Sequence, residues 1–295
     1  LWQLFGEVVV LDKPLPPSDT YLARSPVADV KALIEKDLTE AAAALPVDYS
    51  DAEDGRITKG AATALLGRFY LYDQQWEKAH QTLGTLLGPP YSYTLMPEYN
   101  QLFDHKWEKN NPEHIFAMQM VAVANMGSSM DMWYGGRSTY SRGGSDSFCT
   151  HQILSSYTYA DGTPLDFTTR PKRSDYGADE EIRYGEDLMA WYQALKEAKP
   201  LDKRLQASFM LPTDTLLGAD DVTFRVYWPY EPYVTATPPA YQTEFVSYLM
   251  FSWRKFVNTG NENPIRWDSP NNMPLIRFAD VLLMYAEALN EDDGP

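Results

Sequence analysis

Two carboxylates interrupt the apolar segment RFADVLLMYAEALN, and their spacing limits the chemistry that they could perform. Asp280 and Glu287 are seven residues apart, which places both on one face of a helix. Along the helix axis this spacing corresponds to about 10.5 Å. The two carboxyl groups of a glycosidase lie roughly 5 to 9.5 Å apart. We therefore interpret the pair as two anchors on a structural helix and not as a catalytic acid and base.

The rest of this segment indicates how the two anchors should be held. Apolar residues surround the helix that we expect over residues 274–290, so this helix should be buried between neighbouring helices. Arg277 stands three residues before Asp280, and we expect a local ion pair between them. Glu287 is expected to meet a partner on another helix.

No other residues form a recognised catalytic or metal-binding pattern. The four histidines lack the H-x-x-x-H spacing of a metal site. Cys149 and His151 are two residues apart, so their side chains should point in different directions, and we interpret Cys149 as a buried or incidental cysteine. The segment DYSDAEDG lacks the register of a calcium loop. We predict no enzymatic activity, no metal-ligating residues and no cofactor.

Charge and composition exclude several classes of partner. The 295 residues include 41 acidic and 25 basic ones, a formal charge of −16. Nucleic acids and anionic lipid surfaces are bound through clustered Lys and Arg, so neither is expected as a partner. A single cysteine excludes a disulfide within the chain, and no apolar run reaches the roughly 18 residues of a membrane span.

Both ends of the chain are interpreted as cuts within a longer protein. The chain starts with LWQLFGEVVV, in the middle of a hydrophobic pattern and without Met, and it stops at NEDDGP, which resembles a turn into another element. The absence of a signal peptide therefore says nothing about localisation.

Residues 63–90 carry the spacing of a tetratricopeptide hairpin, in which two antiparallel helices pack closely. Small residues on each helix would allow the approach, and larger ones would fill the seam. The segment YDQQW supplies the turn. The residues that match the pattern are Leu66, Gly67, Tyr70, Ala79 and Leu83.

Other elements follow from local signals. Ser25 before Pro26 predicts a helix start with Ser25 as its N-cap, and Thr58 is expected to cap the first helix of the hairpin. The alternating segment 113–125 predicts a short strand. Further along we expect a short helix over 147–157 and a polar helix over 178–197.

These elements define a mainly α fold in which tetratricopeptide-like helical hairpins are interrupted by a long loop-rich insertion with a few short strands. We expect a helical region over residues 1–90, a loop-rich ligand-binding region over 91–270, and a returning helix over 271–295. Long irregular loops in a compact protein are usually functional or disordered, and the abundant aromatic residues favour function.

Two aromatic clusters in these loops are the candidate ligand-binding residues. Sugar rings present apolar C–H faces rimmed by hydroxyls, which suit a Trp or Tyr face beside polar groups. The alternative is that the rings simply pin down the loops. The candidates are Trp133, Tyr134 and Arg137 in the first cluster, and Trp228, Tyr230 and Tyr233, around two prolines, in the second.

An ordered set of motifs resembles the SusD/RagB family of outer-membrane nutrient-binding lipoproteins. GRITKGAATALLGRFYLY near the start is followed much later by MPLIRFADVLLMYAEALNE. Between them lie further segments in the family's order, including LFD, NNPEHIFAMQ, YTYADGTPL and LDKRLQA. The resemblance covers nearly the whole chain.

The resemblance implies a non-catalytic protein that binds oligosaccharide or polysaccharide at the cell surface. Its hairpins would dock on a SusC-like TonB-dependent transporter, to which the glycan is delivered. Family members are lipid-anchored to the outer membrane through an N-terminal Cys, which has no counterpart here because Cys149 is interior. Two alternatives remain: a RagB-like peptide-binding lipoprotein, and a scaffold whose helical repeats serve only protein–protein assembly.

Overall fold

The computed structural model groups the chain into two compact units, which we describe separately. The helical unit comprises Leu1–Leu95, Pro112–Met118 and Pro274–Pro295, and the loop-rich unit comprises Met96–Asn111 and Gln119–Met273. Within them the structure describes residues 2–11, 13–16, 18, 21–50, 53–107, 111–139, 143–144, 147–227, 238–240, 250–260 and 267–293.

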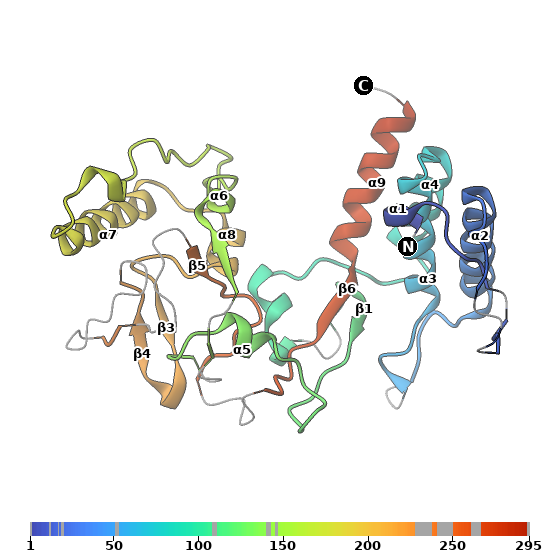
Figure 1. Cartoon of the computed structure of the whole chain (residues 1–295), viewed down its shortest axis with the longest axis horizontal. Coiled ribbons are helices and arrows are strands. Elements are labelled where there is room, and N and C mark those ends of the chain that lie inside the picture. The colour runs from blue at the N-terminus through green and yellow to red at the C-terminus, as the bar shows by residue number, and fades with distance from the viewer. Residues whose placement is uncertain are drawn as a thin grey trace. The chain divides into compact units, whose positions relative to one another are not determined.

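The helical unit is built from antiparallel hairpins (Figure 1). Helix α3 packs against both α2 and α4, and α4 packs in turn against α9. The helices are α1 (Trp2–Phe5), α2 (Val27–Ala44), α3 (Lys59–Tyr72), α4 (Trp76–Gly84) and α9 (Phe278–Asp293), with a 3₁₀ turn, η3 (Thr85–Leu87), after α4.

The two predicted helix caps have different outcomes. Thr58 caps α3 as predicted, because its hydroxyl oxygen accepts a hydrogen bond from a backbone N–H of the first turn, at 3.3 Å. The prediction for α2 is wrong, since Pro26 and not Ser25 occupies the N-cap. The Ser25 hydroxyl accepts a hydrogen bond from the Val10 backbone N–H instead, at 3.3 Å, and so ties the preceding connector to the helix start.

The seam between α3 and α4 confirms the predicted tetratricopeptide spacing. Leu83 and Ala79 of α4 are fully buried, and Leu66 and Tyr70 of α3 are nearly so. A Cβ atom at Gly67 would lie 2.5 Å from the Leu83 side chain, so only glycine allows this approach. The seam therefore depends on one small residue facing one large one.

Asp280 and Glu287 of α9 differ in their contacts. Asp280 forms an ion pair with Arg68 of α3, which confirms it as an anchor between helices. The expected Arg277–Asp280 pair is wrong: Arg277 lies in a strand, where helical i, i+3 spacing does not apply, and its guanidinium donates to buried Glu113 at 2.6 Å. The expected partner for Glu287 is also wrong, because its side chain is exposed and meets no partner in the described part of the chain.

A two-stranded sheet precedes α9 in the helical unit. Strand β1 (His114–Met118) pairs with β6 (Met273–Arg277), and β6 runs directly into α9. The strand predicted over 113–125 thus exists but is shorter. The helix predicted over 274–290 begins only at Phe278, whose backbone N–H donates to the Glu113 carbonyl at 2.9 Å and so anchors the helix start on β1.

The loop-rich unit consists of short elements joined by long connections. Strand β2 pairs antiparallel with β5, and β3 pairs antiparallel with β4. The predicted helices over 147–157 and 178–197 correspond to the shorter α6 and to α7. The helices and strands are α5 (Met130–Tyr134), α6 (His151–Leu154), α7 (Glu181–Ala198), α8 (Lys203–Ser208), β2 (Phe148–Thr150), β3 (Thr215–Leu217), β4 (Thr223–Arg225) and β5 (Met250–Ser252). The described part of this unit also contains the 3₁₀ turns η4 (Tyr99–Phe103), η5 (His105–Trp107), η6 (Arg173–Asp175) and η7 (Ala219–Asp221).

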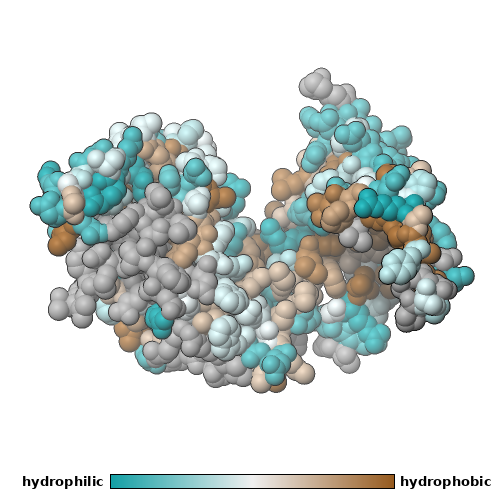
Figure 2. All heavy atoms as spheres, viewed as in Figure 1, coloured by the Kyte–Doolittle hydropathy of each residue, from teal (hydrophilic) through white to brown (hydrophobic). Residues whose placement is uncertain are grey.

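The core of the loop-rich unit forms where one face of α7 meets β5 and the end of α8. Tyr184, Leu188 and Tyr192 of α7 are almost fully buried there, together with Phe209 and Phe251. The outer surface over α7 is mainly hydrophilic, whereas hydrophobic residues are exposed among the helices of the helical unit (Figure 2). Within the described ranges, no helix is both long and apolar enough to cross a membrane.

Candidate functional site

Two exposed tryptophans of the loop-rich unit lie against each other. The ring centroids of Trp133 and Trp267 are 6.1 Å apart and their planes meet at 70°, an edge-to-face arrangement. The side chains remain 41% and 50% exposed. A large aromatic side chain that remains solvent-exposed although it packs against a second ring is typical of a surface that contacts a ligand. We refer to Trp133 and Trp267 as the tryptophan pair.

Trp133 is held by the short helix α5. Its indole N–H donates to the Ser129 hydroxyl at 3.1 Å, one turn earlier in the chain. Asp131 of the same helix is completely buried, and its carboxylate accepts hydrogen bonds from the Asn258 backbone N–H at 3.2 Å and from the Asn258 side-chain amide at 3.0 Å. A buried carboxylate requires such donors, so α5 is fixed at this point.

Trp267 is held by the residues that follow it. Ser269 and Ser128 exchange two backbone hydrogen bonds of 2.8 Å, and the Asp268 carboxylate accepts from the Gly127 N–H at 3.1 Å. A Cβ atom at Gly127 would lie 2.2 Å from the Asp268 Cα atom, so the two backbones can approach this closely only because residue 127 is glycine.

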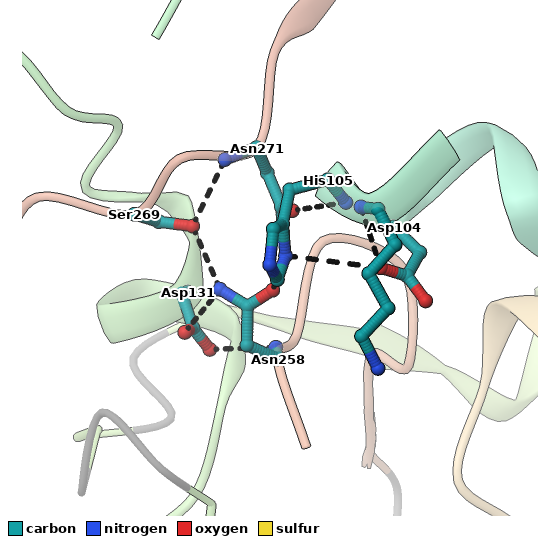
Figure 3. Close-up of polar contacts among 7 residues, drawn as sticks. Asp104, His105, Asp131, Asn258, Ser269 and Asn271 are labelled. Carbon is teal, nitrogen blue, oxygen red and sulfur yellow. Dashed lines mark hydrogen bonds and ion pairs between the residues drawn. The ribbon is translucent and has the colours of Figure 1, made fainter. Parts of the chain in front are cut away.

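One side-chain amide joins the two segments that carry the tryptophan pair (Figure 3). The Nδ2 group of Asn258 donates both to the Asp131 carboxylate, at 3.0 Å, and to the Ser269 hydroxyl, at 2.9 Å. Asp131 stands two residues before Trp133, and Ser269 stands two residues after Trp267. The buried amide of Asn258 therefore sets the position of one tryptophan relative to the other.

The side-chain oxygen of Asn258 contacts His105. Because Nδ2 of Asn258 donates to two acceptors, Oδ1 must accept, and His105 Nδ1 therefore donates to it at 3.1 Å. The His105 backbone N–H donates to Asn271 Oδ1 at 3.0 Å. The Asn271 backbone N–H donates to the Ser269 hydroxyl at 3.3 Å, so the network closes on itself (Figure 3).

The predicted ligand-binding residues differ in how exposed they are in the structure. Trp133 is exposed in the tryptophan pair, and Arg137 is exposed on the turn after α5. Tyr134 is half-buried and packs against the rings of Trp253 and Phe256, with centroids 6.0 and 6.4 Å away. The second predicted cluster, Trp228, Tyr230 and Tyr233, lies outside the described residues.

Sequence reasoning missed Trp267 and Asn258. Trp267 satisfies the criterion that selected Trp228, a Trp in a loop with neighbouring prolines, and the same criterion could have found it. Asn258 carries no such signal, because nothing in the sequence distinguishes a buried bridging amide from an exposed one.

Among the residues that the structure describes, the single cysteine and the possible metal ligands bear on nucleophilic and metal chemistry. Cys149 is buried, and this burial raises the pKa of its thiol to about 12, so the thiol stays protonated at neutral pH. No cluster of three or more His, Cys, Asp or Glu side chains suited to a metal occurs among the described residues. What the site offers is aromatic surface and hydrogen-bonding groups.

Comparison with known proteins identifies the family. Residues 112–295 match the profile of the SusD family, and the chain belongs to this family. Residues 1–71 match a related profile described as starch-binding associating with outer membrane. These matches confirm the family predicted from the motifs. No functionally curated protein matches the chain in sequence.

Solved structures share the fold. A SusD-like protein from Bacteroides fragilis is 25% identical with a TM-score of 0.70, over 98% of this chain and 54% of that one. A SusD-like carbohydrate binding protein from Bacteroides fragilis is 22% identical with a TM-score of 0.71, over 97% and 51%. Surface glycan-binding protein A from Bacteroides thetaiotaomicron, in complex with laminarihexaose, is 16% identical with a TM-score of 0.52, over 100% and 55%.

This chain thus spans about half the length of the structures that it matches. The predicted fold class, mainly α with a loop-rich insertion and a few short strands, is confirmed by these matches and by the elements of the chain itself.

Proposed function

We propose that this protein binds oligosaccharide or polysaccharide at the cell surface without transforming it. The observation that carries the proposal is the tryptophan pair, whose exposed rings are fixed by a buried amide. A preorganised aromatic surface loses little conformational entropy when a sugar ring stacks on it. The exposed Ser129 hydroxyl, which accepts from the Trp133 indole N–H, supplies a polar group beside this ring that suits the hydroxyl rim of a sugar.

The family supports this proposal. Solved relatives with the same fold include a protein described as a laminarin-binding SusD-like protein, 22% identical with a TM-score of 0.56. We further propose that the intact protein is anchored to the outer membrane through a lipidated N-terminal Cys. It would deliver its glycan to a SusC-like TonB-dependent transporter that contacts the helical unit.

Affinity electrophoresis of the protein through gels containing laminarin and other polysaccharides tests the proposal. Retardation by at least one glycan is expected. Trp133→Ala and Trp267→Ala should each weaken it at least tenfold, about 1.4 kcal/mol, because each removes one stacking surface. Trp107→Ala is the matched control, since Trp107 is 49% exposed and lies outside the pair.

Other outcomes point to the alternatives. If no glycan retards the folded protein but peptides change its tryptophan fluorescence, and Trp133→Ala abolishes that change, the site binds peptides. If neither class of ligand binds while the transporter still co-purifies with the Trp133→Ala variant, the protein is an assembly scaffold.

A further inference from the structure

The loop-rich unit contains a pocket of about 180 Å³ that the tryptophan pair does not line. It opens between the η4 and η5 turns, α8 and the segment after β5. Asn258 and Asp104 belong both to its wall and to the polar contacts of Figure 3. The lining residues are Asn100, Phe103, Asp104, Ala207, Arg254, Lys255, Val257, Asn258 and Thr259.

Arg254 contributes a hydrogen-bond donor without an acceptor. Its Nη2 group donates to the Asp214 carboxylate at 3.0 Å, but its Nε atom is buried and has no partner among the residues that the structure describes. The Asp214 carboxylate also forms an ion pair with the Lys196 ammonium group at 2.6 Å. One carboxylate is therefore shared by two cations, which leaves an excess of positive charge next to the pocket.

Lys255 adds a second cation to the wall itself. Its ammonium group donates to the Tyr99 hydroxyl at 2.7 Å and lies 4.5 Å from the centre of the Phe103 ring. Among the described lining residues Asp104 is the one carboxylate, and it stands beside the two cations Arg254 and Lys255. The whole chain carries a formal charge of −16. The positive charge beside the pocket is therefore a local property and does not follow from the overall composition.

Two neutral polar groups and an apolar surface complete the lining. The side chains of Asn100 and Thr259 form no hydrogen bond in the described part of the protein, so both are available to a ligand. Phe103, Val257 and Ala207 supply apolar surface. The volume lies below the roughly 300 to 1,000 Å³ of pockets for drug-sized ligands, so it suits a single small ring and not a chain.

We infer that this pocket binds a carboxylate-bearing monosaccharide unit, such as a hexuronate. The carboxylate would meet the donors of Arg254 and Lys255 in charge-assisted hydrogen bonds. The ring hydroxyls would bond to Asn100 and Thr259, and the apolar face of the ring would lie against Phe103 or Val257. This inference does not depend on the ligand of the tryptophan pair, because the two sets of lining residues are separate.

Calorimetric titration of the protein with D-glucuronate tests the inference, with D-glucose as the neutral counterpart. Glucuronate should bind at least tenfold more tightly than glucose, and raised salt should reduce this difference. The double variant Asn100→Ala/Thr259→Val should weaken glucuronate binding about fivefold while breaking no internal hydrogen bond. Arg254→Lys keeps a cation near Asp214 but removes the Nε donor, and should weaken binding about tenfold.

Gln152→Ala, an exposed substitution on α6, should leave glucuronate binding unchanged. Trp133→Ala should also leave glucuronate binding unchanged, even if this variant no longer binds polysaccharide. The pocket and the tryptophan pair are therefore tested independently of each other. Equal binding of glucose and glucuronate, equal competition by acetate, or no glucuronate binding to the folded protein would overturn the inference.

Discussion

The two units of this protein each have an apolar core, but they differ in the number of polar side chains that they bury. In the helical unit the residues at the α3–α4 seam are apolar, and Thr63 and Glu113 are the only buried polar residues among those that the structure describes there. The other buried polar and charged residues of the described chain belong to the loop-rich unit, and they include Asp131, Asn258 and Ser269.

The difference has a physical cause in the backbone. A helix satisfies its own backbone N–H and carbonyl groups, so its buried face needs only apolar side chains. Irregular segments leave many of these groups unpaired, and buried side chains such as that of Asn271, which accepts from the His105 N–H, must take up the role. The loop-rich unit is therefore specified by directed hydrogen bonds, which can also fix exposed side chains such as the tryptophan pair.

The largest expected effect tests the apolar seam. Leu83→Ala should lower the free energy of unfolding by about 3 kcal/mol, because the fully buried side chain leaves a cavity against Gly67. Leu283→Ala is the matched control: Leu283 is 71% exposed, and its loss should change the stability by less than about 0.5 kcal/mol. Urea unfolding followed by far-UV circular dichroism measures both. Equal losses would mean that the seam is not the stabilising element.

A second substitution tests the polar network. Asn258→Ala should cost about 2 kcal/mol, because it removes the side-chain donor from the buried Asp131 carboxylate and an acceptor from His105. It should also change the tryptophan fluorescence, since the bridge between the segments of Trp133 and Trp267 is lost. Asn290→Ala, on the exposed side of α9, should change neither quantity. A native-like spectrum for Asn258→Ala would show that the pair is held by other contacts.

His114 is an exception within the helical unit, and it predicts a pH dependence. Burial, with a smaller contribution from Arg277, lowers the pKa of His114 from 6.5 to about 4, and its Nε2 atom has no hydrogen-bond partner in the described ranges of the chain. Between these values the unfolded chain binds a proton that the native protein does not, so stability falls as the pH is lowered from about 6.5 towards 4.

Urea unfolding at pH 7 and pH 5 checks this pH dependence. The wild-type protein should lose about 1 kcal/mol more than His114→Leu over this interval, a value reduced for the partial exposure of the ring. All other titrating groups are common to both proteins. A His114→Leu variant with the same loss would contradict the assignment.

The smallest expected effect separates stability from binding at the tryptophan pair. Ser129→Ala removes the acceptor of the Trp133 indole N–H at an exposed position, so stability should change by less than about 0.5 kcal/mol. Affinity for a retained polysaccharide should fall about twofold to threefold, because the ring is less well oriented. Ser155→Ala, which removes an exposed hydroxyl bond on α6, should leave the affinity unchanged.

Local signals explain which elements could be predicted. Thr58 at a helix start and Gly67 facing Leu83 act over a few residues or one hairpin, and both were predicted correctly. The prediction for Ser25 failed because a distant segment, at Val10, takes its hydroxyl. The prediction for Arg277 failed for a similar reason: its actual partner, Glu113, lies directly before strand β1, far away in the sequence.

The sequence by itself determined the helical hairpins and the family, because helical periodicity and ordered motifs are properties of the chain. Only the tertiary structure decided that Trp133 and Trp267 form one surface and that Asn258 holds them together. Hydrogen bonds between residues more than a hundred positions apart leave no period in the sequence. Their geometry exists only once the loops have folded against each other.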